Sequence, residues 1–277
     1  MTTRTTDARR HRVPRWPGVC SLVVSGVRIL VLQPSESDPP GALADWLRDA
    51  GAELDVLLPF RDSLPKSLEG YQAVVCLGGE MGAYDDARHP WLADVRRLLA
   101  DAVSGRLPVL AICLGAQLLA VATGGQVRPG AQGPECGTLL VAKRDAASQD
   151  PLLVDLPFTP DVLQFHSDEI AQLPPGALLL AASPKYRNQA FRVGECAYGF
   201  QFHIETTPET VLRWVHASPD VAATAPPGQF EPDHLVRFHA DLAETWQPVA
   251  ARFVRLAAQY AGLLPGEPAP PRRLPLV

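Results

Sequence analysis

Short apolar runs alternate with segments of helical periodicity through the first half of the chain, and this alternation constrains the fold most. The runs are rich in Val, Ile and Leu, which is typical of buried strands. They are residues 27–33, 53–59, 71–79 and 107–112. The helical segments between and after them are residues 41–52, 90–105 and 113–125. This order predicts an α/β, flavodoxin-like, doubly wound and mostly parallel sheet with helices on both faces.

The second half of the chain is denser in short strands. We expect them at residues 137–144, 161–165, 177–183, 189–193 and 198–205. A helix capped by Thr207 follows, and a longer C-terminal helical segment contains Pro248, where we expect a kink. The predicted divisions are a disordered leader (1–25), one α/β domain (26–220), a linker and C-terminal helical extension (221–262), and a disordered Pro-rich tail (263–277).

Charge and cysteine content narrow the classes of function. The net charge is -5 without a long basic run, so we expect neither a nucleic-acid nor an anionic-membrane partner. No apolar run reaches the ~18 residues that a membrane span needs. Five cysteines at irregular spacing make a poor disulfide framework, which favours the reducing cytoplasm. The arginine-containing N-terminus superficially resembles a signal peptide, but its apolar part continues into the first predicted strand.

A single cysteine stands where a buried strand turns into a helix, in "PVLAICLGAQLLA" (108–120). The turn would hold the Cys113 thiol at the carboxyl edge of the sheet, and the helix N-terminus favours the thiolate. The Leu114 amide would point the same way as an oxyanion donor, and Gly115 permits close approach. Gln117 lies one helical turn further on the same face. Cys113 can equally be one more buried apolar-like cysteine, and its position alone leaves both interpretations open.

The stretch "YGFQFHIE" (198–205) offers a base for such a nucleophile. Side chains alternate along a strand, so we expect His203 and Glu205 on one face, and Phe202 and Ile204 in apolar packing on the other. Glu205 would then orient the imidazole toward the thiol. A half-exposed edge strand with two surface polar residues is the alternative.

A metal site is the other interpretation of these histidines. His-x-Glu occurs in zinc deaminases, but the Pro-Cys-x-x-Cys that those enzymes need is absent. His166 and Asp168 could contribute to a second site, yet no further ligand cluster can be recognised in the sequence. We therefore expect no metal and no other cofactor.

A glycine pair ends the third predicted strand, in "CLGGEMGAYDD". Gly78 and Gly79 permit positive φ and let a backbone amide face a bound ligand. If that strand lies beside the strand that precedes Cys113, the amides of Gly79 and Leu114 could converge on one oxygen.

Several segments together resemble the class I, triad-type glutamine amidotransferase family. Within that family they are similar to the glutaminase domain of GMP synthetase, in the form in which that domain occurs as a free-standing protein. The resemblance covers about residues 27–245. Its segments are "LGGEMGAYDD", "HPWL", "PVLAICLGAQLLA", "GGQV", "LPPGALLLAAS", "NQAFRVG" and "YGFQFHIE".

The resemblance implies a catalytic triad and a substrate pocket. The triad would be Cys113, His203 and Glu205, with Gly79 and Leu114 as oxyanion donors. Substrate contacts would come from Gly78, Gln117, His166 and Ser167. By analogy, the element "PECG" places Glu135 and Gly137 near the site. Two residues depart from the family pattern: Ala111 replaces a glycine in the turn, and Glu80 replaces a proline after the glycine pair.

Three functions remain open. The first is hydrolysis of the glutamine side-chain amide to glutamate and ammonia through a cysteinyl γ-glutamyl thioester. No nucleotide-binding fingerprint is found, so the ammonia would pass to a separate acceptor, such as a synthetase, or to solvent. The second is hydrolysis of γ-glutamyl peptides or amines. The third is a non-catalytic regulatory partner built on the enzyme scaffold.

Overall fold

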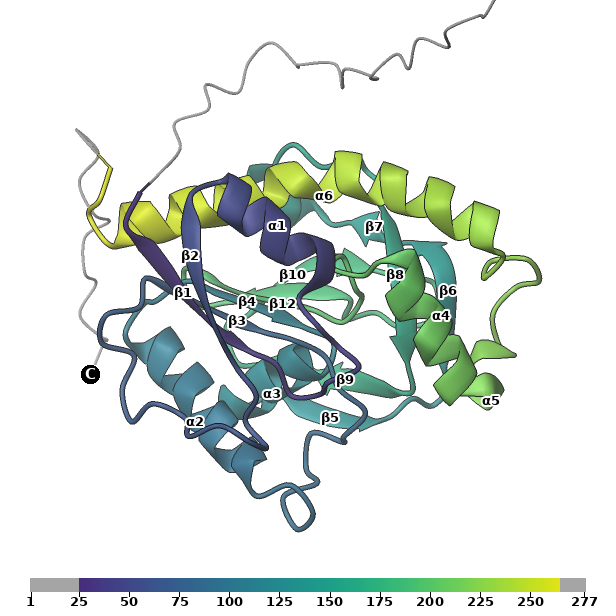
Figure 1. Cartoon of the computed structure of the whole chain (residues 1–277), viewed down its shortest axis with the longest axis horizontal. Coiled ribbons are helices and arrows are strands. Elements are labelled where there is room, and N and C mark those ends of the chain that lie inside the picture. The colour runs from purple at the N-terminus through teal and green to yellow at the C-terminus, as the bar shows by residue number, and fades with distance from the viewer. Residues whose placement is uncertain (1–24, 265–277) are drawn as a thin grey trace, which may run out of the picture.

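The computed structural model describes residues 25–264, so nearly all of the predicted leader and tail lie outside the described residues. An eight-stranded sheet in the order β2-β1-β3-β4-β12-β11-β10-β7 forms its centre (Figure 1). The strands are β1 (Val27–Leu32), β2 (Ala52–Leu57), β3 (Ala73–Cys76), β4 (Val109–Ile112), β7 (Ala142–Lys143), β10 (Leu178–Ala182), β11 (Ala190–Val193) and β12 (Ala197–Phe200).

Most of this sheet is parallel. β2, β1, β3, β4 and β12 pair in parallel, whereas β11, β10 and β7 add an antiparallel edge. The carboxyl ends of β3 and β4 therefore lie side by side, as the predicted site requires. The predicted fold class is confirmed.

Helices cover both faces of the sheet. Alternate residues of β1 point to opposite sides of the sheet. Ile29 joins the core under α1 (Gly41–Asp49) and α6 (Pro232–Tyr260). Leu30 joins the core under α2 (Trp91–Ser104) and α3 (Leu114–Ala122). Helix α3 is apolar except for Gln117, as suits a helix whose residues 114–120 are all buried.

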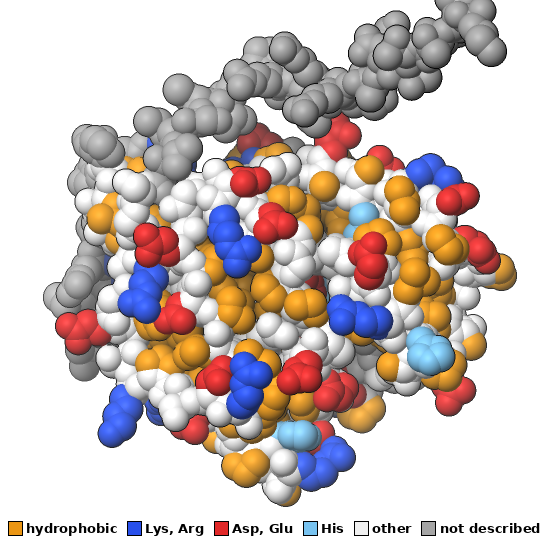
Figure 2. Space-filling view, in the orientation of Figure 1, with side chains coloured by type: hydrophobic (Ala, Val, Ile, Leu, Met, Phe, Trp, Pro, Cys, Tyr) orange, Lys and Arg blue, Asp and Glu red, His pale blue; other side chains and the backbone are white. Residues whose placement is uncertain are grey.

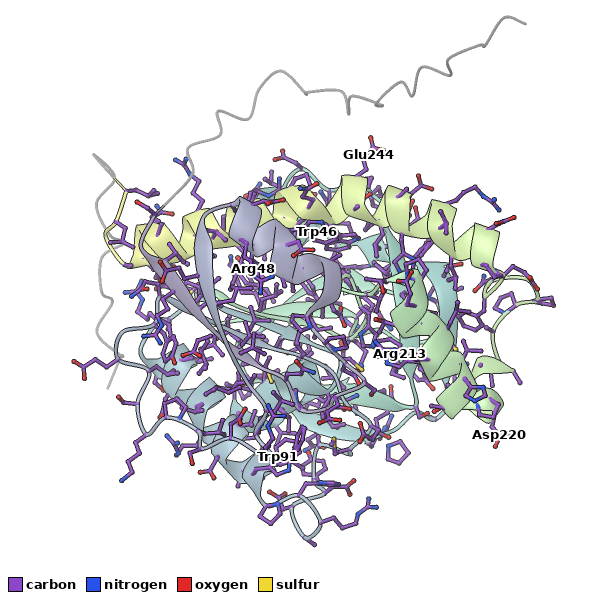
Figure 3. All side chains as sticks on the ribbon, in the orientation of Figure 1. Trp46, Arg48, Trp91, Arg213, Asp220 and Glu244 are labelled. Atoms are coloured by element: carbon purple, nitrogen blue, oxygen red, sulfur yellow. The ribbon has the colours of Figure 1, made fainter. Side chains whose placement is uncertain are left out.

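The C-terminal part consists of α4 (Pro208–Ala217), α5 (Pro219–Ala222) and α6. The Thr207 side chain caps α4 by accepting from the Thr210 amide at 3.3 Å, as predicted. Helix α6 continues through Pro248 as one element, so the predicted kink does not interrupt it. Trp246 and Val249, on either side of Pro248, are buried and stabilise α6 there. Trp46 of α1 lies beneath helix α6 (Figure 3).

Two antiparallel ribbons lie at the carboxyl edge of the sheet. One pairs β6 (Glu135–Leu140) with β8 (Asp161–His166), and the other pairs β5 (Gln126–Pro129) with β9 (Asp168–Gln172). A short 3₁₀ helix spans Asp145–Gln149. Neither β5 nor β9 is predicted from the sequence, because both are short, polar and stabilised by pairing with each other.

The surface carries charges of both signs. Lys and Arg side chains alternate with Asp and Glu side chains over the face in view (Figure 2). Between residues 25 and 264, no helix is both long and apolar enough to cross a membrane.

Candidate functional site

A strained backbone holds Cys113 between β4 and α3. Its φ of 51° and ψ of -110° lie outside the common regions for a side-chain-bearing residue, and conformations of this kind cluster at functional sites. The Cys113 amide donates to the Phe200 carbonyl at 2.7 Å, and the Cys113 carbonyl accepts from the Gln117 amide at 3.0 Å. A Cβ at Gly115 would lie 2.2 Å from the Cys76 carbonyl oxygen, so only glycine fits there. The local sequence thus produces the sharp turn that the pattern predicts.

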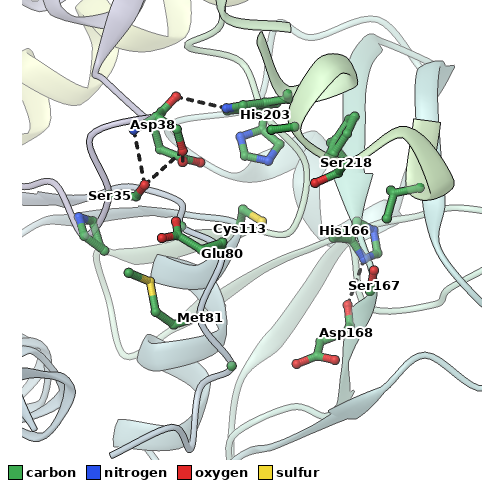
Figure 4. A pocket seen from close by; sticks show the side chains of 18 of the residues that line it. Ser35, Asp38, Glu80, Met81, Cys113, His166, Ser167, Asp168, His203 and Ser218 are labelled. Carbon is green, nitrogen blue, oxygen red and sulfur yellow. Dashed lines mark hydrogen bonds between the residues drawn. The ribbon is translucent and has the colours of Figure 1, made fainter. Parts of the chain in front are cut away.

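His203 and Glu205 form a buried hydrogen-bonded pair, although β12 ends at Phe200 before reaching them. The strand predicted to reach residue 205 is therefore too long, although Phe202 and Ile204 do lie in the apolar core as expected. A single bridge to Leu163 of β8 holds His203 instead, with N–H···O distances of 2.8 and 3.2 Å. Nδ1 of His203 lies 2.7 Å from Oε1 of Glu205, whose Oε2 accepts from the Ile204 amide at 2.9 Å. These contacts orient the other ring nitrogen toward Cys113 (Figure 4).

The electrostatics of His203 favour its charged form. Burial disfavours the imidazolium, but the Glu205 carboxylate and the Cys113 thiol outweigh it and raise the pKa of His203 well above its usual value. Burial raises the pKa of the other described thiols, Cys76, Cys136 and Cys196, to about 12. Among the four described cysteines, Cys113 alone interacts with an imidazole, that of His203.

The glycine pair lies next to this turn. The Gly115 amide donates to the Leu77 carbonyl at 3.1 Å, and a Cβ at Gly79 would lie 3.1 Å from Leu114 Cδ2. Within residues 25–264, the amides of Gly79 and Leu114 have no hydrogen-bond acceptor. Neither glycine of the pair has a positive φ, so that expected reason for glycine is wrong. At Gly78 a Cβ would lie 2.8 Å from Oδ1 of Asp38 and 3.1 Å from Cε1 of His203, so a side chain there would crowd both groups.

Cys113 and His203 lie on the wall of a pocket of about 1050 Å³ (Figure 4). Four of the residues predicted around the nucleophile, Gly79, Gln117, His166 and Ser167, also line it. Among the lining groups that the sequence analysis does not identify are Ser35, Asp38, Phe60, Arg213 and Trp214. The sequence could have predicted a place in the site for Ser35 and Asp38, because they lie in the polar loop that follows β1 at the carboxyl end of a parallel strand.

Gln117 is linked to Cys113 through a second glutamine. The Gln117 side-chain amide donates to Oε1 of Gln201 at 3.3 Å, and Nε2 of Gln201 lies 3.9 Å from Sγ of Cys113. Both glutamines are buried. Gln201 is not among the site residues predicted from the sequence, although this residue lies only two positions before His203.

A second buried pair joins His166 to Glu135. Nε2 of His166 lies 3.2 Å from Oε2 of Glu135, and Nδ1 donates to the Asp168 carbonyl at 2.8 Å. Glu135 also accepts from Ser183 at 2.6 Å and from Gln189 at 2.7 Å. The pair therefore supports the pocket wall.

Gly137 does not line the pocket. It has a φ of 126°, and a Cβ there would overlap the Gln229 side chain. That side chain accepts from the Thr138 amide at 2.8 Å. Glycine at this position therefore allows the loop before α6 to approach β6.

The two departures from the family pattern are accommodated. Ala111 is fully buried in the core under α2 and α3 and pairs with Gly199 of β12, which itself has no side chain. Glu80 is exposed and lies at the pocket rim. No group of three or more His, Cys, Asp or Glu side chains in the described part of the chain is arranged to hold a metal ion.

Comparison with known proteins decides the family. The family model "Glutamine amidotransferase class-I" matches residues 41–212, more than half of the chain. The chain belongs to the class I glutamine amidotransferase family. A crystal structure of a family member, a glutamine amidotransferase from Thermotoga maritima, is 32% identical with a TM-score of 0.72, and the match covers 83% of this chain and 98% of that one.

Two curated relatives of the present chain are named for different activities. A GMP synthase [glutamine-hydrolyzing] of Christiangramia forsetii is 34% identical over 53% of this chain, and the match spans only 27% of the synthase. Gamma-glutamyl peptidase 4 of Arabidopsis thaliana is 28% identical over 57% of this chain and 64% of the peptidase.

Proposed function

We propose that this chain hydrolyses the side-chain amide of glutamine to glutamate and ammonia, with Cys113, His203 and Glu205 as the catalytic triad. The observation that carries the proposal is the strained Cys113 beside an imidazole whose far nitrogen is held by a buried carboxylate. This is the arrangement of nucleophile, base and orienting acid that acyl transfer needs.

In the first half of the reaction, the Cys113 sulfur attacks the amide carbon. The carbonyl oxygen becomes an oxyanion and accepts from the free amides of Gly79 and Leu114, each worth about 3 kcal/mol in comparable sites. His203 transfers the thiol proton to the nitrogen, the C–N bond breaks, and ammonia leaves a γ-glutamyl thioester. Water activated by His203 then releases glutamate.

Two further assignments go with this function. The ammonia passes to a separate acceptor protein, a synthetase, by analogy with the glutamine-hydrolysing relatives. The cytoplasm is the compartment, which four free cysteines in the described residues support.

The size of the pocket favours a second candidate, hydrolysis of γ-glutamyl peptides or amines. About 1050 Å³ is at the upper end of small-molecule pockets and leaves room beside a glutamine-sized ligand. The similarity to gamma-glutamyl peptidase 4 points the same way.

A glutamate-release assay tests both candidates. Wild-type protein is incubated with glutamine and, separately, with γ-glutamyl dipeptides, and Cys113→Ala serves as the inactive control. We expect glutamate from the wild type only, and the ratio of the two kcat/KM values ranks the candidates. Equal glutamate from both proteins would eliminate the enzymatic proposal. Failure of a thiol-reactive glutamine analogue to label Cys113 would then favour a non-catalytic regulatory partner.

A further inference from the structure

Asp38 is a buried carboxyl group on the pocket wall that the proposed triad does not use. It is 8% exposed and lies in the loop between β1 and α1. Oδ2 accepts from the Ser37 hydroxyl at 2.5 Å, whereas Oδ1 has no hydrogen-bond donor among residues 25–264. One acceptor atom of a largely buried carboxyl group is therefore open to the pocket.

The open oxygen lies beside the reacting groups. A Cβ built at Gly78 would be 2.8 Å from Oδ1 of Asp38, 3.1 Å from Cε1 of His203 and 3.6 Å from Cβ of Cys113. The three side chains thus surround the same point above Gly78. In the view of Figure 4, Asp38 and His203 lie above Cys113, and His166 lies to its right.

The surrounding loop is built to hold Asp38 in this position. The Asp38 amide donates to the Ser35 carbonyl at 3.3 Å, and the Trp214 indole donates to the Ser37 carbonyl at 2.9 Å. The loop's far end is fastened to the triad segment, because the Ala42 amide donates to the Glu205 carbonyl at 2.9 Å. Trp214 therefore connects the two groups, because its ring also packs on His203 at 4.7 Å.

We propose that Oδ1 of Asp38 accepts a hydrogen bond from the leaving nitrogen of the substrate while His203 protonates that nitrogen. This inference rests on the proposed function. His203 must lie next to the leaving nitrogen in order to protonate it, so an acceptor beside its ring faces the remaining N–H. Asp38 takes no proton: the C–N bond breaks, the thiol proton reaches the nitrogen through His203, and the amine leaves with its electron pair.

The charges around Asp38 agree with such a role. Burial raises the pKa of the Asp38 carboxyl, while the Ser37 hydroxyl and His203 lower it and Glu205 and Glu80 raise it further. A buried carboxylate is stabilised by a neighbouring group that gains positive charge. The departing nitrogen gains such charge when His203 protonates it. The site therefore selects γ-glutamyl amides that carry at least one N–H on the leaving nitrogen.

The test compares leaving groups in the wild type and in Asp38→Asn. The substrates are glutamine, its γ-N-methylamide, its γ-N,N-dimethylamide and glutamate γ-methyl ester, whose leaving oxygen carries no hydrogen. Because kcat/KM reports the acylation step, we expect Asp38→Asn to lower it about tenfold to a hundredfold for glutamine and the methylamide. The values for the ester and the dimethylamide should change less than about threefold, since they offer no such hydrogen bond.

Each other outcome overturns the inference in a distinguishable way. An equal loss for ester and amides means that Asp38 acts through folding or through another part of the substrate, and no loss for glutamine means that it makes no such contact. If the wild type hydrolyses none of the four compounds, the proposed function fails as well.

Two controls make the result decisive. Asp45→Asn removes an exposed carboxylate on α1 and should leave all rates unchanged. If Asp38→Asn does not fold, the wild type alone decides. Its kcat/KM for each amide is divided by the rate constant for alkaline hydrolysis of the same amide. This ratio must be at least about tenfold higher for the methylamide than for the dimethylamide. Equal relative rates would overturn the inference.

Discussion

Two buried histidine–glutamate pairs lie among residues 25–264, and they differ in whether a ring nitrogen remains free. His203 is bonded to Glu205 through Nδ1 only, so Nε2 faces the Cys113 thiol. His166 meets Glu135 through Nε2 and the Asp168 carbonyl through Nδ1, so both ring nitrogens are occupied. A histidine that is hydrogen-bonded to a carboxylate can therefore act as a base only when its second ring nitrogen faces the reacting atoms.

The two glutamates differ in the same way. Within the described part of the chain, the Glu205 carboxylate is bonded to its histidine and to one backbone amide, whereas Glu135 is held by the side chains of Ser183 and Gln189 as well. We therefore assign the first pair to chemistry and the second to the structure of the pocket wall.

Replacing each histidine should give the largest difference between the pairs. His203→Gln removes the proton carrier, and we expect kcat/KM for glutamine to fall by about 10⁴-fold. His166→Gln removes only a ring that lines the pocket, and its kcat should stay within about tenfold of the wild type. Steady-state glutamate release measures both, and comparable losses would show that the distinction between the pairs is wrong.

Replacing the glutamates should separate activity from stability. Glu205→Gln leaves the imidazole without its anionic partner, and we expect a loss of about 10²–10⁴-fold in kcat. Glu135→Gln instead disturbs a buried hydrogen-bond network and should lower the free energy of unfolding by about 1–3 kcal/mol. Urea unfolding and initial rates on the same preparations test this, and the prediction fails if Glu135→Gln is as inactive as Glu205→Gln.

The pH dependence of stability should report the raised pKa of His203. Because this pKa lies above its unfolded value of about 6.5, the stabilisation is fully present below that pH and is lost as the pH rises through the folded value. Glu205→Gln removes the main attraction that raises the pKa. The difference in unfolding free energy between wild type and Glu205→Gln should therefore shrink as the pH rises from 6, as urea titrations would show. A difference that is constant or grows contradicts the assignment.

The smallest effects should come from the aromatic rings that cover the two histidines. Trp214 packs on His203 at 4.7 Å and Tyr186 on His166 at 5.8 Å, and each also donates a hydrogen bond to a backbone carbonyl. Trp214→Phe and Tyr186→Phe should each cost about 1 kcal/mol of stability. Only Trp214→Phe should also lower kcat/KM, by a few-fold, because it loosens the loop that carries Asp38. Thermal unfolding and rate measurements check this, and a larger rate loss for Tyr186→Phe would reverse the comparison.

Local sequence patterns are enough to predict most of the secondary structure of this chain. Apolar runs and helical periodicity predict the strands and helices on both faces of the sheet, and the strand–Cys113–helix order predicts the sharp turn, because these features depend on neighbouring residues. The pairing of His203 with Glu205 was also predictable from their closeness in the chain, although the assumed strand does not reach them.

The contacts between residues far apart in the chain could not be predicted in this way. Placing β12 beside β4 brings His203 to Cys113, and the loop after β1 brings Asp38 to both. The β5–β9 ribbon likewise forms from two segments that carry little strand signal of their own. The physical reason is that these contacts depend on sheet order and on long-range packing, which local propensity does not encode.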